Sequence, residues 1–352
     1  MESMDQGERK DTAQHALVYV GIGTGIVLLL ALLWYALDVL LLLFIGVLLA
    51  VLLRAPADWL SERSGWSEGW TLALVMLLFA AALSAASVLF GRAVVNQSWE
   101  LTRQLPEVVD KARERLRQSE WGKRVLAAAK TSTPESDMKF VGRGLRLIGS
   151  TFAALGSLVV VAFLAVFLAW QPSAYVRGFV LLFPQRRRRR ARQVLGAIGD
   201  VLTRWLVGQL ILMTIVATLT GAGLMLLGVP FALPLALFAG LLEFVPYVGP
   251  IVAAIPAILV AFAESPQLAL WVAALYLAVQ SLESYVLTPL IQHRAVYMPP
   301  ALILLAQVVL GVTAGPLGVI VATPLAAAAL IAVNMLYVED VLGDDSASMR
   351  ST

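Results

Sequence analysis

VPFALPLALFAGLLEFVPYVGPIVAAIPAILVAFAE (residues 229–264) is an almost wholly apolar run that Pro246-Tyr247-Val248-Gly249-Pro250 interrupts in its middle. We predict a broken, re-entrant-type helical hairpin with legs at 231–245 and 251–262. At 1.5 Å per residue each leg is roughly 18–23 Å long, which is short for a bilayer core of about 30 Å. Proline removes a backbone donor, so we expect breaks near Pro246 and again near Pro250. The backbone groups freed there must face protein or water rather than lipid.

A second apolar run, residues 300–337, has the same design. Gly311–Pro316 and Pro324 interrupt it, and as one helix it would be roughly 57 Å long, more than a bilayer needs. An offset of 66 residues maps Pro234 onto Pro300 and Gly249-Pro250 onto Gly315-Pro316. These matches indicate either an internal repeat or a coincidence in a proline-rich membrane protein. Paired, interrupted apolar segments of this kind point to the binding site of a transporter.

Composition sets the class of the protein. The chain has 352 residues, 60% hydrophobic and 14% charged, and its mean hydropathy is +0.83. Apolar runs of about 20 residues recur, which predicts an all-α, polytopic integral membrane protein. There is no cysteine, and the two histidines are His15 and His293. We therefore expect no disulfide framework, no metal site and no cofactor, with H⁺ or Na⁺ as the candidate coupling ion.

The chain divides into five parts by composition. We expect a flexible tail at 1–15, three membrane spans within 16–90, and an extracytoplasmic amphipathic helical region at 91–146. A permease core at 147–337 contains the two broken hairpins, 229–264 and 300–337. Residues 338–352 are predicted to form a disordered polar tail.

Charge predicts the orientation. Arg186–Arg190 and Arg192 form a basic run in a predicted loop at 171–204, which either binds nucleic acid or obeys the positive-inside rule. The run lies between two predicted spans and lacks interleaved aromatics, so we interpret it as a cytoplasmic loop that contacts anionic lipid headgroups rather than nucleic acid. This assignment places both termini in the cytoplasm. It also makes the two hairpins enter from opposite sides, as in an inverted repeat that works by alternating access.

Two carboxylates lie in apolar surroundings, which is costly and marks a functional-site hypothesis. Glu243 precedes the first interruption, where it either binds a cation, a proton or a polar solute, or caps freed amide donors. Glu283 belongs to a predicted span at 268–287. Its polar face carries Tyr276, Gln280, Glu283 and Ser284 at helical spacing. That face either lines the transport pathway or holds neighbouring helices together.

Other residues are assigned by their place in the interruptions. The predicted hairpin joints, whose carbonyls are candidate cation ligands, are Pro246, Gly249, Pro250, Gly315 and Pro316. Further candidates for the pathway are Tyr247, Gln307, Thr323 and Asn334.

Three segments resemble the signature of the autoinducer-2 exporter-like (AI-2E) permease family: GVPFALPLALFAGLLEFVPYVGPIVAAIPA (228–257), ESYVLTPLIQHRAVYMPP (283–300) and GPLGVIVATPLAAA (315–328). The resemblance implies an inner-membrane permease of about eight membrane segments. It also implies a homo-oligomer, with a pentamer as the candidate. Members are described as exporters of a furanone signal and some relatives as Na⁺(Li⁺)/H⁺ antiporters, so the resemblance leaves the solute open.

This chain departs from the family pattern in one segment. His293 stands where the family typically has glycine, and Met298-Pro299-Pro300 replaces the common His-Pro. These departures leave the local substrate or gating chemistry open.

The remaining function classes are weighed by motif. The chain has no Walker A motif and no HExxH motif, and the predicted spans contain no lysine. We therefore predict a secondary transporter for a small polar or amphiphilic solute rather than an enzyme. A non-transporting scaffold or a channel stays as the alternative, although a channel would carry a continuous polar ring at one depth.

Overall fold

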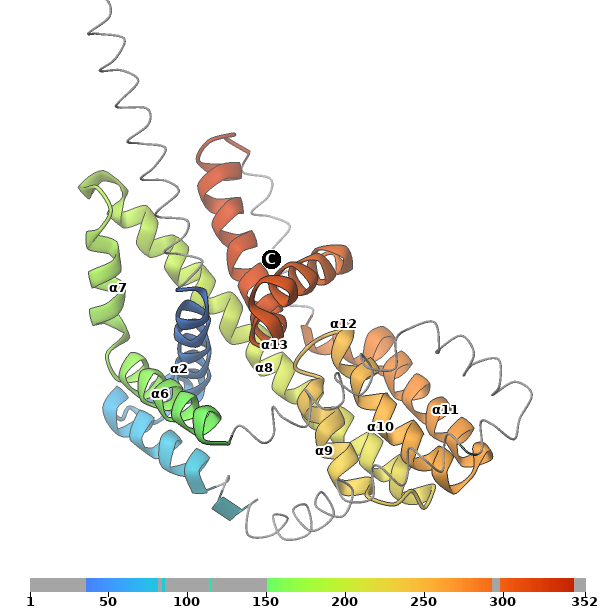
Figure 1. Ribbon diagram of the computed structural model, residues 1–352. Coiled ribbons are helices and arrows are strands. Elements are labelled where there is room, and N and C mark those ends of the chain that lie inside the picture. Colours follow the sequence, from blue (N-terminus) through green and yellow to red (C-terminus); the bar gives the residue numbers. More distant parts are fainter. Residues whose placement is uncertain (1–35, 82–83, 86–113, 115–150, 293–297, 345–352) are drawn as a thin grey trace, which may run out of the picture.

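The computed structural model describes residues 36–81, 84, 85, 114, 151–292 and 298–344, and within those residues it contains helices and no strand (Figure 1). The predicted tail at 1–15, all of the predicted region 91–146 except residue 114, and the first 20 residues of the predicted membrane part 16–90 fall outside them. The helices are α2 (Leu37–Ser64), an unlabelled helix Glu68–Ala81, α6 (Thr151–Trp170), α7 (Pro172–Leu181), the 3₁₀ turn η1 (Gln185–Arg187), α8 (Arg188–Leu226), α9 (Ala232–Leu242), α10 (Val248–Glu264), α11 (Pro266–Leu282), the π-helical segment η2 (Glu283–Leu287), α12 (Thr288–Gln292), α13 (Pro300–Val333) and the π-helical segment η3 (Asn334–Glu339).

Helix length and composition identify a multi-pass membrane protein. Four helical stretches in the described residues are long and apolar enough to cross a bilayer: Leu37–Ser64, Gln185–Leu226, Pro266–Ile291 and Pro300–Glu339. A fifth span arises if α6 and α7, which bend by 87° at Gln171, count as one. Large apolar side chains face outward, such as Leu226 at 88% exposed and Val312 at 83%. A bilayer or a neighbouring subunit accounts for such a surface. The full count of about eight segments remains a prediction.

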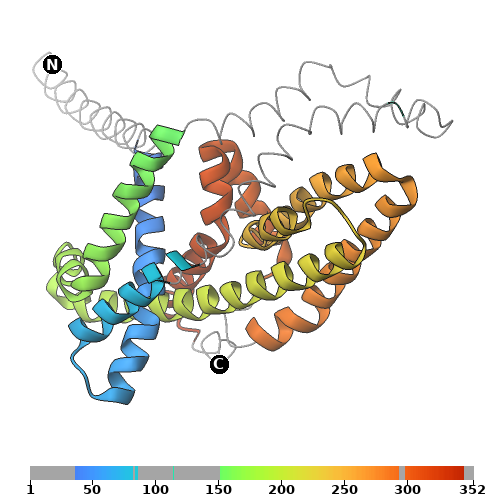
Figure 2. The ribbon, with the colours of Figure 1, turned by 90° about the horizontal axis from the view of Figure 1, so that it is seen from below.

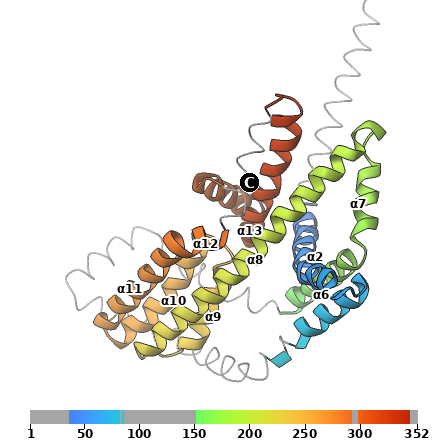
Figure 3. The same cartoon turned by 180° about the vertical axis from the view of Figure 1, so that it is seen from behind.

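α8 is the axis of the fold (Figures 2 and 3). Its 39 residues extend over about 58 Å. α2 and α7 pack near its beginning, with α6 against α2, whereas α9 and α11 pack near its end and α10 lies between them. The predicted loop at 171–204 is wrong as secondary structure, because α7, η1 and the first half of α8 occupy it. Arginine is a good helix former, so a dense basic run does not stop a helix.

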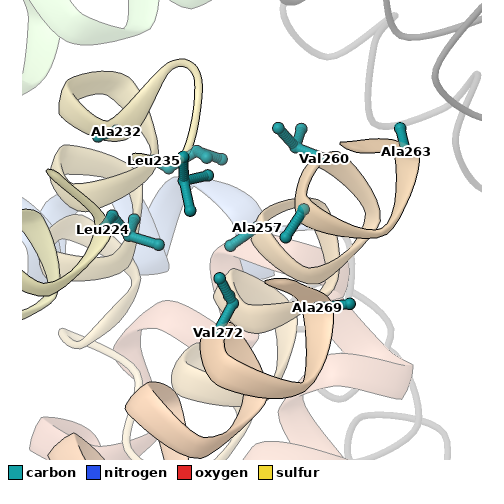
Figure 4. Close-up of a cluster of buried hydrophobic side chains, with 10 residues drawn as sticks. Leu224, Ala232, Leu235, Ala257, Val260, Ala263, Ala269 and Val272 are labelled. Atoms are coloured by element: carbon teal, nitrogen blue, oxygen red, sulfur yellow. The ribbon is translucent and has the colours of Figure 1, made fainter. Parts of the chain in front are cut away.

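The first hairpin packs against α8 through buried apolar residues and one glycine. Leu224 of α8, Leu235 of α9, Ala257 of α10 and Val272 of α11 meet in one buried cluster (Figure 4). A Cβ on Gly240 would lie 2.6 Å from the Cβ of Ala217, so glycine permits the close approach of α9 to α8. This packing fixes the position of the hairpin break.

Candidate functional site

The first apolar run breaks between α9, which ends at Leu242, and α10, which begins at Val248. Tyr247 has a φ of 65° and a ψ of −52°, and the Val248 N–H donates to the Pro246 carbonyl at 2.8 Å. This is a γ-turn of the rare, strained form, which persists only where its surroundings enforce it. The break expected near Pro246 lies there. The break expected at Pro250 is wrong, because Pro250 occupies the first turn of α10, where the missing N–H costs nothing.

Two buried glutamines satisfy carbonyls that the break frees. Gln209 of α8 donates from Nε2 to the Glu243 carbonyl at 2.5 Å, and Gln307 of α13 donates from Nε2 to the Pro246 carbonyl at 2.9 Å. Both side chains are 2% exposed. If either carbonyl faced lipid without a donor, the fold would lose free energy of stabilisation. Three helical elements therefore converge on the break: the hairpin, α8 and α13.

Glu243 and Glu283 meet at one small cavity beside the break. The Glu243 residue is 3% exposed, so its carboxylate is shielded from bulk water. The cavity has a volume of about 10 Å³, which is close to the least that holds one water molecule. Its lining residues are Val216, Thr220, Ala239, Glu243, Pro250, Ala253, Tyr276, Val279, Gln280 and Glu283. The fold thus brings the two predicted carboxylates together.

Glu283 is held in one orientation by three donors. Thr288 Oγ1 donates to Oε1 at 2.5 Å, while Gln280 Nε2 at 2.5 Å and Ser284 Oγ at 3.0 Å donate to Oε2. The Thr288 N–H also bonds to the Glu283 carbonyl, five residues back, in the π-helical segment η2. In an α-helix a residue five positions on lies about 140° around the axis, so the wider π turn brings Thr288 over Glu283.

Two further polar atoms of the cavity wall lack partners in the part of the chain that the structure describes. These are Thr220 Oγ1 and the Tyr276 hydroxyl. Thr220 is 1% exposed. Buried polar groups are nearly always hydrogen-bonded, often to an ordered water. The cavity therefore presents two carboxylates and two unpaired hydroxyls to whatever occupies it.

The second apolar run bends at Gly315, which has a φ of 64° and a ψ of −149° inside α13. Pro316 follows and starts the second part of the helix. The break expected at Pro324 is wrong, because the backbone there is helical. Prolines are tolerated in membrane helices where neighbouring groups compensate.

The two interruptions do not align at the predicted offset. A Cβ on Gly249 would lie 1.8 Å from the Leu242 carbonyl oxygen, and one on Gly318 would lie 2.1 Å from that of Leu310. By steric role Gly249 corresponds to Gly318, and by its positive φ Gly315 corresponds to Tyr247. The 66-residue offset instead pairs Gly249 with Gly315, which have different structural roles. The inverted repeat remains a prediction.

The other predicted pathway residues do not line this cavity. Tyr247 is 40% exposed, Thr323 is buried with an unpaired Oγ1 within the described structure, and Asn334 begins η3. Gln209 and Thr220 were not predicted from the sequence. Gln209 carried a usable signal, since it is the one amide in the apolar stretch 205–227.

Comparison with known proteins gives consistent matches. A family model described as "AI-2E family transporter" matches residues 24–337. "Putative transport protein MT0215" of Mycobacterium tuberculosis is 29% identical over 287 residues, which are 80% of this chain and 78% of that protein. "Putative transport protein YrrI" of Bacillus subtilis is 33% identical over 156 residues, 44% of each chain. "Putative transport protein YueF" of the same organism is 29% identical over 167 residues, 47% of this chain and 45% of that one. The aligned part thus spans less than half of the two Bacillus relatives.

Proposed function

The chain belongs to the AI-2E transporter family, and on this premise we propose that it is an exporter-type permease for a small polar or amphiphilic solute. An autoinducer-2-like signal or a related metabolite is the solute class that we propose. Family membership supports the assignment as a membrane transport protein. The solute, the alternating-access mechanism and the coupling to H⁺ or Na⁺ are our proposal.

The coupling proposal rests on the position of Glu243 and Glu283, which both line one cavity. Two carboxylates that share a water-poor space repel each other unless a cation or a proton lies between them. Thr220 Oγ1 and the Tyr276 hydroxyl supply further oxygens at the same place. The site lies beside a helix break, where unwound backbone in transporters coordinates coupling ions.

The size of the cavity favours a second candidate, an Na⁺(Li⁺)/H⁺ antiporter without an organic solute. A volume of about 10 Å³ accommodates a water molecule or a bare ion, and a furanone ring is much larger. The exporter proposal therefore requires a further conformation in which the hairpin and α11 separate. A channel or a scaffold is the third candidate, and neither needs such a change.

Location and assembly follow the same reasoning. We place the chain in the cell inner membrane with both termini in the cytoplasm, on the basis of the basic run at Arg186–Arg192. We propose a homo-oligomer, with a pentamer as the expected form, which the outward-facing apolar side chains support. The mass of the purified complex tests the subunit number.

Transport in proteoliposomes tests the function. Purified protein would be reconstituted, a pH or Na⁺ gradient imposed, and internal pH read together with uptake of a furanone signal. Wild type would be compared with Glu243→Gln and Glu283→Gln, and with Glu264→Gln as the control. Glu264 ends α10 of the same hairpin but is exposed and outside the cavity. We expect gradient-driven flux in wild type and Glu264→Gln, and its loss in both cavity variants.

Each other outcome selects a different candidate. Proton flux driven by Na⁺ without furanone uptake supports the antiporter. Equal flux in all variants contradicts a coupling role for the two carboxylates. Flux of many ions without saturation indicates a channel, and no flux from folded protein with any tested solute favours the scaffold.

A further inference from the structure

A second, larger cavity lies at the other end of α8. It has a volume of about 560 Å³ and opens between α7, η1, the first turns of α8 and the end of α13 with η3. In Figure 1, α7 and the C-terminal helix stand on either side of the first half of α8. The residues that line the cavity are Phe179, Phe183, Arg186, Arg187, Arg190, Ala191, Val194, Leu195, Ile198, Ala332, Leu336, Asp340 and Val341. The wall is therefore mainly apolar, and its charged members are three arginines and one aspartate.

The arginines of the basic run have different roles. Arg190 bonds to Glu339 Oε2 at 2.7 Å and to Asp340 Oδ1 at 2.9 Å, which ties α8 to η3 and offsets both carboxylates. Arg188 donates to the Phe183 carbonyl at the end of α7. Arg186 and Arg187 are exposed, and no described residue pairs with either of them. Within the described structure, two positive charges that line the cavity thus have no ion-pair partner.

We propose that this cavity binds one acidic phospholipid, with its phosphate on Arg186 and Arg187 and the upper part of an acyl chain against the apolar wall. Guanidinium groups match phosphate oxygens in geometry and charge. An apolar wall beside them selects an amphiphile over a free anion, because a free anion gains nothing from that surface. A volume of 560 Å³ falls within the usual range for drug-sized ligands, about 300–1,000 Å³, and fits a headgroup with part of one chain.

The proposal differs from general attraction to a charged membrane. Basic residues near a bilayer attract anionic lipids wherever they lie. A built site instead distinguishes Arg186 and Arg187 from Arg189 and Arg192, which belong to the same run and are exposed but do not line the cavity. The lipid would bridge α7, α8 and the end of α13 at the predicted cytoplasmic surface.

Lipid binding by the purified full-length protein in neutral detergent tests the site. Fluorescent phosphatidylglycerol would be titrated and its anisotropy read, with phosphatidylcholine and glycerol 3-phosphate as competitors. The variant R186Q/R187Q would be compared with R189Q/R192Q, which removes the same charge. We expect at least about tenfold weaker binding for the first and a change within about twofold for the second. Phosphatidylcholine and glycerol 3-phosphate should compete poorly.

A cavity-filling variant makes the test independent of charge. Ala332→Phe adds a ring to the apolar wall and should weaken phosphatidylglycerol binding, with the melting temperature showing that the protein is folded. Equal losses in the two double variants would overturn the proposal in favour of surface electrostatics. Full binding by folded Ala332→Phe would also overturn it. Competition by glycerol 3-phosphate as strong as that of the lipid would assign the site to a soluble anion instead.

Discussion

Gln307 Nε2, in the second interrupted segment, donates a hydrogen bond of 2.9 Å to the backbone carbonyl of Pro246, in the break of the first. The Pro246 carbonyl also accepts the Val248 N–H of the strained γ-turn. Gln209 supplies the neighbouring bond, to the Glu243 carbonyl. A displacement of α13 relative to the hairpin must therefore break one of these contacts or move the segment that carries Glu243. This links the second interruption to the first carboxylate.

The two glutamines should differ in their contribution to stability. Gln209→Leu removes the buried amide that donates to the Glu243 carbonyl, and a buried carbonyl that loses its donor costs about 1–3 kcal/mol. Gln307→Leu should cost less than about 1 kcal/mol, because the Pro246 carbonyl keeps the Val248 N–H and the unpaired Gln307 Oε1 disappears. Thermal melting in detergent, followed by tryptophan fluorescence, measures both. A larger loss for Gln307→Leu would contradict the assignment of these bonds.

Gly249 is predicted to be intolerant of any side chain. Its added Cβ would lie 1.8 Å from the Leu242 carbonyl oxygen, so Gly249→Ala must separate α9 from α10 or distort the γ-turn. We expect a loss of more than about 2 kcal/mol in stability and reduced transport. Gly178→Ala in α7 is the control, because a Cβ there meets nothing within 4 Å. Unchanged melting of Gly249→Ala would show that the break is looser than the structure indicates.

Local sequence patterns predicted two features of the site. The polar face of 268–287 was visible from spacing alone, and Gln280 and Ser284 do bond to Glu283. The break at Pro246 followed from proline chemistry. Both features depend on residues close together in sequence, where backbone geometry fixes the contacts.

Tertiary contacts and single-residue shifts in helix geometry were not predictable. No local pattern places Glu243 and Glu283 at one cavity, since this requires α8, α9, α10 and α11 to pack as one cluster. The hydrophobic pattern does not predict the π turn at Glu283, and this turn brings Thr288 to the carboxylate. The break predicted at Pro250 was wrong for a related reason, because the effect of a proline depends on its position within the helix.

Thr288 should tune the coupling site without supporting the fold. Thr288→Val removes the donor to Glu283 Oε1 and keeps the shape of the side chain. Hydrogen bonds within membrane helices contribute about 0.6 kcal/mol on average, so melting should hardly change. On the proposed function, ion-driven flux should fall several-fold or its ion dependence should shift, since Glu283 Oε1 loses its donor while Oε2 keeps Gln280 and Ser284.

The matched control for Thr288 is Ser281→Ala. The Ser281 hydroxyl lies on α11 and bonds to the carbonyl of Leu277 in its own helix, not to Glu283. Flux measured across a series of pH and Na⁺ concentrations compares the two variants. Equal flux in both would remove Thr288 from the coupling site.

A substitution at Gly315 tests the effect of backbone strain in the second interruption without a steric clash. Its φ of 64° and ψ of −149° belong to a region that is essentially restricted to glycine, yet an added Cβ would meet nothing within 4 Å. Gly315→Ala should therefore lower stability by about 1–3 kcal/mol through strain alone. Gly196→Ala, in open space within α8, should be neutral or stabilising by up to about 1 kcal/mol. Thermal melting of the two variants side by side is the measurement. If Gly315→Ala melts like wild type, α13 can straighten at this point, and the bend is then set by its neighbours rather than by the glycine.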